Sequence, residues 1–255
     1  MAAQVHQLTH PPVREALIDI QFTPATDLAI LEAFAAELAG EFDGSSPIWR
    51  TQFGLHLGPE GAGQAQEPQV AQLGLRLPSL QRSYVLQCRL NGFTLSRLSP
   101  YDQWEEFKAN ARRYWERFLA MVAPVDTDQS RVTQITVRYV NELRLPLPLR
   151  DFSDYLTAPP EVPASLPQAL QSFLQRVVIP LPDDERTVAV ITQALDAPQP
   201  PADAVSVILD IDVRRHLDIG FAVPEPLWHA LDRLRDEKNK IFFNYITERM
   251  LEQIR

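Results

Sequence analysis

Two long amphipathic stretches of this chain begin in the same way, and this repeat constrains the fold more than any other feature. Over 101–122 and again over 225–254, apolar residues recur at spacings of three and four, which is typical of a helix with one buried face. Each stretch has a proline, a tryptophan four residues later and an apolar residue seven later: Pro100, Trp104 and Phe107 in the first, and Pro224, Trp228 and Leu231 in the second.

Extended segments separated by turns and loops precede each long helix and predict strands, and the first one of each half shows period-two alternation. In the first half they are 15–22, 48–57, 70–77, 83–90 and 92–98; in the second they are 135–140, 175–181, 186–195, 204–213 and 217–222. A short helix is expected after the first strand of each half, over 28–38 with Thr26 as its cap and near 164–174. Ser99 and Pro100 predict the start of the first long helix.

Each half therefore has the order strand, helix, several strands, long helix. We expect an α+β protein made of tandem duplicated units, 1–124 and 125–255, which share one curved antiparallel sheet with helices on one face. This arrangement resembles the TATA-binding-protein-like fold in topology. The alternative is a single irregular α+β domain.

Composition limits the classes of function. Asp and Glu total 33 against 24 Lys and Arg, which gives a formal net charge of −9. An acidic body argues against binding to duplex nucleic acid, and no apolar run is long enough to cross a bilayer. The single cysteine, Cys88, and an N-terminus without a signal-peptide pattern predict a reducing, cytoplasmic location.

The candidate site lies on the face of the predicted sheet that the helices leave open. Alternation turns Ile18, Val137 and Ile211 toward the helices and the polar neighbours the other way. Four ionisable side chains are expected to meet where the first strands of the two halves adjoin, and two aspartates extend the surface: Glu15, Asp19, Arg138, Glu142, Asp210 and Asp212. A simple polar outer face is the alternative interpretation.

Asp210 and Asp212 stand two residues apart, so on a strand both carboxylates point to the same face. Such a pair is able to hold a divalent cation through oxygen ligands. Arg214 and Arg215 follow at once, however, and such neighbours favour ion pairs. No metal site, cofactor or catalytic residue is therefore assigned.

The rest of the sequence indicates no metal-binding, catalytic or nucleotide-binding motif. The histidines have no metal-ligand spacing, and the sequence contains no nucleophile elbow, phosphate loop or dinucleotide-binding turn. Cys88 is expected in the core, as are the tryptophans at helical spacing. The basic triplet Lys238-Asn239-Lys240 is expected on a solvated helix face.

Several phrases together resemble a sporadically distributed bacterial family of uncharacterised proteins of about this length. They are Pro12 to Ala16, Gly92 to Leu98 with Tyr101 and Trp104, Arg138 to Asn141, Leu209 to Asp212, and Lys238-Asn239 with Phe242, Phe243, Thr247 and Glu248. The resemblance implies a bacterial cytoplasmic protein without assigned catalytic residues. Patchy distribution is typical of mobile and defence-associated genes, so it suggests an antitoxin-like or antiphage accessory role.

We therefore expect a non-catalytic binding protein that engages a protein partner or a polar small molecule, with a homodimer left open. The alternative from a different class is a divalent-metal-dependent hydrolase or nuclease that uses Asp210 and Asp212 with Glu15 or Glu142. Nucleic-acid binding through local arginine clusters is a third hypothesis.

Overall fold

The chain forms one large antiparallel sheet with helices on one side. The computed structural model describes residues 8–52, 69–122, 129–168, 170–182, 184–196, 204–221 and 225–255, with the backbone of 55–57 and 63–65. Pro224, which the helix repeat uses, lies outside the described residues, as does His6.

The main sheet has nine strands in the order β2-β5-β6-β7-β1-β8-β11-β10-β9, and every neighbouring pair is antiparallel. Their bounds are β1 Val13–Thr23, β2 Ser46–Gln52, β5 Gln69–Pro78, β6 Tyr84–Arg89, β7 Gly92–Leu98, β8 Arg131–Pro146, β9 Leu174–Pro180, β10 Thr187–Asp196 and β11 Ala204–Gly220. A separate two-stranded sheet pairs β3 (Leu55–Leu57) with β4 (Gly63–Ala65).

Strands β1 and β8 pair at the middle of the main sheet. On one side of this pair β1 contacts β7, and on the other side β8 contacts β11. The first strand of each half of the chain therefore pairs with the last strand of the same half, and the two first strands pair with each other.

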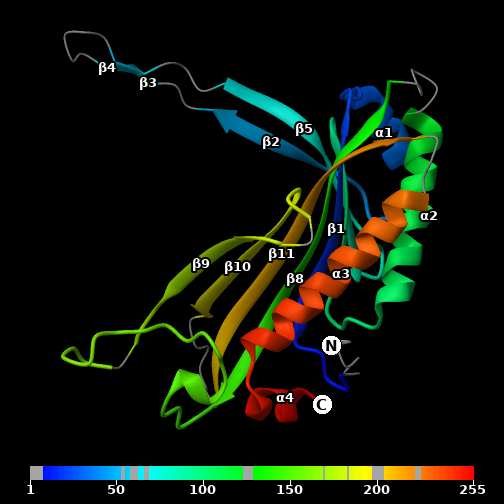
Figure 1. Cartoon of the computed structure of the whole chain (residues 1–255). Coiled ribbons are helices and arrows are strands. Elements are labelled where there is room, and N and C mark those ends of the chain that lie inside the picture. The colour runs from blue at the N-terminus through cyan, green and yellow to red at the C-terminus, as the bar shows by residue number, and fades with distance from the viewer. Residues whose placement is uncertain are drawn as a thin grey trace.

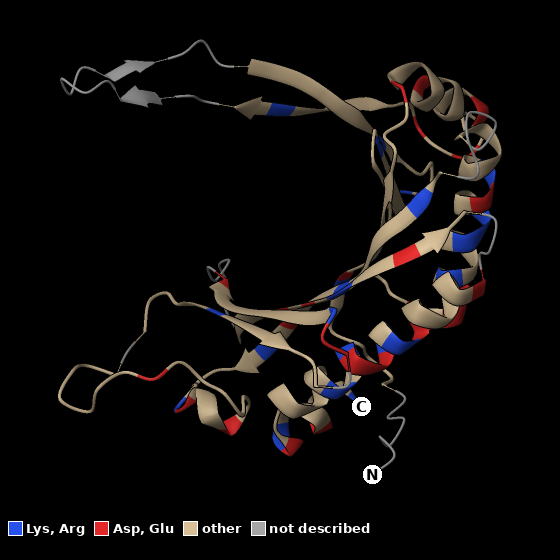
Figure 2. Ribbon diagram, turned by 45° about the horizontal axis from the view of Figure 1, so that its top comes forward, with Lys and Arg blue, Asp and Glu red and all other residues tan. Residues whose placement is uncertain are grey.

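The long helices α2 (Trp104–Val122) and α3 (Glu225–Tyr245) lie on the same face of the sheet, while α1 (Leu28–Glu37) lies beside α2 and α4 (Glu248–Ile254) follows α3 (Figure 1). The sheet curves strongly, with the helices on its outer side and the opposite face open (Figure 2). The prediction of an α+β protein with an antiparallel sheet is confirmed.

The core fills the space between the sheet and the long helices. In β1, Ala16, Ile18 and Ile20 are fully buried on the helix side. Phe22 at the end of the strand packs against Trp115, with ring centroids 6.1 Å apart. The apolar side chains of the alternating strands and of the helices with three-to-four spacing therefore face the same interior. Burial of these side chains is the main term that stabilises the fold.

The two tryptophans of the repeat are buried, as predicted for core residues. Trp104 is 5% exposed and Trp228 is 3% exposed. The indole Nε1 of Trp104 donates a hydrogen bond of 2.8 Å to Asp232 of α3. The two long helices also contact each other where Arg112 of α2 donates a hydrogen bond of 2.5 Å to Glu225, the first residue of α3.

Several predicted boundaries are wrong. The helix expected near 164–174 does not form: the described part of that segment has turns and bends, and a 3₁₀ turn at Phe152–Asp154 lies earlier. Pro163 and Pro167 explain this, because proline lacks the N–H that a helix interior needs and restricts the residue before it.

Helix starts also differ from the sequence pattern. Helix α2 begins at Trp104 rather than at Pro100, and Asp27, not Thr26, precedes α1. The predicted last helix is divided at Ile246, because Thr247 caps a new helix by accepting a hydrogen bond from the Met250 N–H. The weak strand expected over 217–222 is the end of the long strand β11.

Candidate functional site

The open face of the sheet carries all six predicted site residues. Residues directly opposite one another on neighbouring strands share a face, so the register decides which side chains meet. In β1, Leu17 lies opposite Ser96 of β7 and opposite Arg138 of β8. Because Ala16 and Ile18 point into the core, this row points away from the helices, into the concavity seen in Figure 2.

Arg138 and Asp210 form the best-defined pair of this face. The guanidinium donates through Nε to Oδ1 of Asp210 at 2.8 Å and through Nη2 to Oδ2 at 2.7 Å. The planar guanidinium donates two parallel hydrogen bonds to the carboxylate, a geometry that the ammonium group of a lysine does not offer. The side chain of Asp210 is 19% exposed and that of Arg138 is 41% exposed, so the pair is half-buried. The hydrogen bonds to Asp210 raise the pKa of Arg138.

Asp212 lies directly opposite Arg138 in register, yet it bonds another guanidinium. Arg214 donates to Oδ1 of Asp212 at 3.1 Å and to Oδ2 at 2.5 Å. Each aspartate of the Asp-x-Asp motif is therefore held by its own arginine, although the two carboxylates share a face.

Asp19 belongs to a second group on the other side of β1. Thr94 of β7 donates to its Oδ1 at 2.5 Å, and Arg89 of β6 makes an ion pair with the same oxygen. Asp19 is only 8% exposed. A nearly buried carboxylate needs such partners, because an unpaired charge there would be costly.

Glu142 belongs to a third group, at the far end of β8. Its Oε1 accepts a hydrogen bond of 2.9 Å from the Ser206 hydroxyl, and its Oε2 lies 3.2 Å from Nε of Arg14. Arg14 also contacts Asp196 at 3.1 Å. Glu15, by contrast, is half-buried between Leu98 and Val140 in register.

The prediction that Glu15, Asp19, Arg138 and Glu142 meet at the centre is therefore wrong in its contacts. All four lie on the open face, on β1 and β8, but Asp19, Arg138 and Glu142 each pair with a different residue outside the group. Within the group, the charge of Glu15 acts on Arg138 and helps to raise its pKa. The partners Thr94 and Ser206 were not expected. Alternation shows which face a side chain points to, but only the register shows what lies beside it.

The arrangement offers no evident metal centre. Among the residues that the structure describes, no group of three or more His, Cys, Asp or Glu side chains is placed to hold a metal ion. Cys88 is fully buried, and burial raises the pKa of its thiol to about 12, which agrees with the predicted core role.

Lys238 contradicts the expectation of a solvated face over 238–240. It is 8% exposed, and its Nζ lies 3.7 Å from the centre of the Tyr139 ring. The hydroxyl of Tyr139 lies 2.6 Å from the hydroxyl of Tyr101. Burial, with a smaller contribution from Arg235, lowers the pKa of Lys238 to about 7. Sequence reasoning missed this residue, although its spacing from Leu234 and Phe242 places it on the buried stripe of α3.

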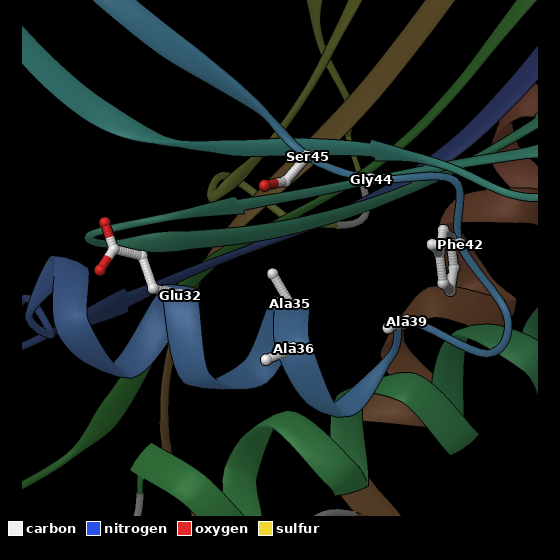
Figure 3. A pocket seen from close by; sticks show the side chains of 7 residues that line it. All are labelled: Glu32, Ala35, Ala36, Ala39, Phe42, Gly44 and Ser45. Atoms are coloured by element: carbon white, nitrogen blue, oxygen red, sulfur yellow. The ribbon is translucent and has the colours of Figure 1, made fainter.

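A cavity of about 300 Å³ lies elsewhere, beside α1 (Figure 3). Its lining consists of alanines on α1 and residues of the following loop, with Glu32 and Ser45 as polar groups: Glu32, Ala35, Ala36, Ala39, Phe42, Gly44 and Ser45. None of the six predicted site residues contributes to it.

Within the described part of the chain, no helix has both the length and the apolar character needed to cross a membrane. Compared with known proteins, the chain matches no family model and no curated protein sequence.

Proposed function

We propose that this chain is a non-catalytic binding protein that contacts a protein partner through the open face of its sheet. The observation that carries the proposal is the concave face itself, which the described helices leave uncovered (Figure 2). Sheets with one uncovered face commonly present polar residues to solvent, but here arginine–carboxylate pairs alternate with half-buried aliphatic side chains such as Leu17, Val140 and Ile208.

A protein partner fits this surface better than a small molecule. Small ligands are held in enclosed pockets that bury most of their surface, whereas protein interfaces are broad and combine apolar contacts with charged groups. The cavity beside α1 contains none of the predicted site residues. The paired arginines would supply charge complementarity and orient the partner.

The strand order supports the proposal that the chain is a duplicated unit with a TATA-binding-protein-like topology. In each half the first strand pairs with the last, the two first strands pair with each other, and the long helices lie on one face. On this proposal the centre of the open face is a junction of two units, 1–124 and 125–255. The bacterial family that the sequence resembles suggests a cytoplasmic, defence-associated role for the partner complex.

The test is co-purification from the native host with matched variants. Arg138→Glu places a carboxylate next to Asp210 and Asp212 on the open face, and Arg233→Glu makes the same charge change at an exposed position of α3. We expect a specific protein to be recovered with the wild type and with Arg233→Glu but lost with Arg138→Glu. Binding should then be repeated with the two purified proteins.

A second open-face variant covers the case in which Arg138→Glu is poorly folded. Thr192 lies opposite Asp210 in register, so Thr192→Arg adds bulk to the face while meeting a carboxylate. Thr192→Arg should melt near the wild-type temperature, whereas Arg138→Glu should melt lower because it breaks the pair with Asp210. Recovery of the same partner by all folded variants would contradict the proposed face.

The alternative is a divalent-metal-dependent hydrolase that uses Asp210 and Asp212. The observation in its favour is that both carboxylates lie on the open face, but a cation would have to displace Arg138 and Arg214. A ligand that binds the folded state raises the melting temperature by mass action. A shift with Mn²⁺ that Asp212→Asn abolishes would support the hydrolase, and no shift in either protein would oppose it.

A further inference from the structure

Strand β9 forms one edge of the main sheet, and its outer side has no partner among the described strands. Its sequence is Leu-Gln-Arg-Val-Val-Ile-Pro, with one charged residue. Leu174 is 75% exposed, Val178 is 52% exposed and Ile179 is 39% exposed. Natural edge strands are usually short, charged or covered, because unpaired backbone groups next to apolar side chains recruit another strand.

The backbone hydrogen bonds show which groups of β9 face outward. Leu195 donates its N–H to the carbonyl of Phe173, and Leu181 donates its N–H to the carbonyl of Thr187. In an antiparallel pair, residues that exchange hydrogen bonds alternate with residues that do not. The odd-numbered residues of β9 therefore bond to β10, and the even-numbered residues, Leu174, Arg176, Val178 and Pro180, direct their backbone groups to the open edge.

We propose that a second copy of this chain adds to the edge, with β9 pairing antiparallel with β9 of the other copy about a two-fold axis at Val177. In this register Arg176 lies opposite Val178 of the second copy, and Leu174 lies opposite Pro180. The interface is isologous, so the same contacts occur twice.

The backbone favours this register over its neighbours. All the outward N–H groups, those of Leu174, Arg176 and Val178, find a carbonyl in the other copy. Pro180 has no N–H to donate. Because it lies at the end of the pairing, the missing donor leaves one carbonyl without a partner in each copy, that of Leu174. An axis at Arg176 would put two guanidinium groups opposite each other, and an axis at Val178 would leave Leu174 beyond the paired segment.

Side chains agree with the same register. The axis brings Val177 against Val177 of the second copy on one face and places Arg176 beside Val178 on the other. No like charges are opposed, and the exposed aliphatic side chains gain cross-strand neighbours. The dimer would join the two sheets into one continuous sheet without using the pairs around Arg138 and Asp210, so this inference does not depend on the proposed function.

The first test measures the mass of the pure protein by light scattering at micromolar concentration. The wild type should have the mass of a dimer. Val177→Lys puts two ammonium groups opposite each other and should raise the dissociation constant about tenfold or more. Thr51→Lys, on the opposite edge strand β2, is the matched control and should leave the dimer unchanged. A wild-type monomer, or a Val177→Lys protein that dimerises normally, would overturn the proposal.

A second test fixes the register and does not depend on weakening the interface. Val177→Cys should form a disulfide-linked dimer on mild oxidation, because residue 177 opposes itself, whereas Ile179→Cys should not, because residue 179 opposes Gln175. The native Cys88 is buried and does not interfere. Mixing Val177→Lys with Val177→Glu should restore a dimer. Equal cross-linking of both cysteine variants, or a mixture that stays monomeric, would overturn the register.

Discussion

The ammonium group of Lys238 lies over the ring of Tyr139, with 3.7 Å between Nζ and the ring centre. Among the described residues, no carboxylate contributes to the pKa of this lysine. A cation over an aromatic face gains some electrostatic energy, but burial of an unpaired charge costs more. The lowered pKa of Lys238, about 7, expresses that cost.

We expect Lys238→Met to stabilise the protein by a few kcal/mol near pH 6, because methionine fills the same space without a charge. Lys240→Met is the control: Lys240 is on the same helix, is half exposed, and pairs with Glu237. Urea unfolding of the three proteins measures the free energy of unfolding. A destabilised Lys238→Met protein would show that the lysine is held by contacts that outweigh its burial.

The same substitution should make stability less dependent on pH. In the unfolded chain Lys238 binds its proton up to about pH 10.5, whereas in the folded chain it loses the proton above about 7. Between these values the unfolded state binds more protons, so the wild-type protein gains stability as the pH rises. The advantage of Lys238→Met is therefore largest below about pH 7 and shrinks toward pH 10.5. An advantage that is constant over this range would contradict the assignment.

Trp104→Ala should cost about 3–5 kcal/mol, because it removes a large buried side chain and leaves a cavity. Trp104→Phe keeps most of the packing but loses the hydrogen bond to Asp232, and it should cost less. At Trp228 the indole N–H is buried without a hydrogen-bond partner, so Trp228→Phe removes an unsatisfied donor and should cost less than Trp104→Phe. Chemical denaturation decides the order. A Trp104→Ala protein with unchanged stability would contradict the core role.

The periodic patterns predict the faces of the elements correctly. Ile18 and Val137 point into the core and Asp19 and Arg138 point away, as alternation indicates. The same patterns do not predict which side chains pair across the strands. Asp19 meets Arg89, which is distant in sequence, and a period of two says nothing about which residues lie opposite each other.

The sequence-based prediction failed where the chemical type of a residue and its place in the periodic pattern indicate different environments, and at several helix boundaries. Lys238 follows the apolar spacing of Leu234 and Phe242, but its charge suggests a solvated face. The short helix expected near 164–174 rests on a weak pattern among prolines, which the backbone does not support. Helix starts at Trp104 and Leu28 depend on local backbone geometry that residue types alone do not determine.

Gly74→Ala should destabilise the protein strongly. A Cβ at this position would lie 2.1 Å from the backbone carbonyl oxygen of Cys88 and 2.7 Å from Cα of Arg89, so β5 and β6 would have to separate. Gly40→Ala is the control, since nothing lies within 4 Å of the added atom there, and it should be neutral or slightly stabilising. Equal melting temperatures for the two variants would contradict the close approach of the strands.

The coupling between Arg138 and Asp210 should be intermediate between those of a surface pair and a buried pair. Exposed ion pairs contribute about 0–1 kcal/mol, while removal of one partner of a buried pair costs about 3–5 kcal/mol. Here the aspartate is 19% exposed and the arginine 41% exposed, and two hydrogen bonds join them. We therefore expect a double-mutant cycle of Arg138→Ala and Asp210→Ala to give a coupling of about 1–2 kcal/mol.

Asp210→Ala alone frees Arg138 to approach Asp212, which lies opposite it in register. This single variant should therefore lose less stability than Arg138→Ala. Thermal and urea unfolding of the four proteins complete the cycle. A coupling near zero would mean that the pair is fully solvated, and the open face would then hold its arginines too loosely to orient a partner.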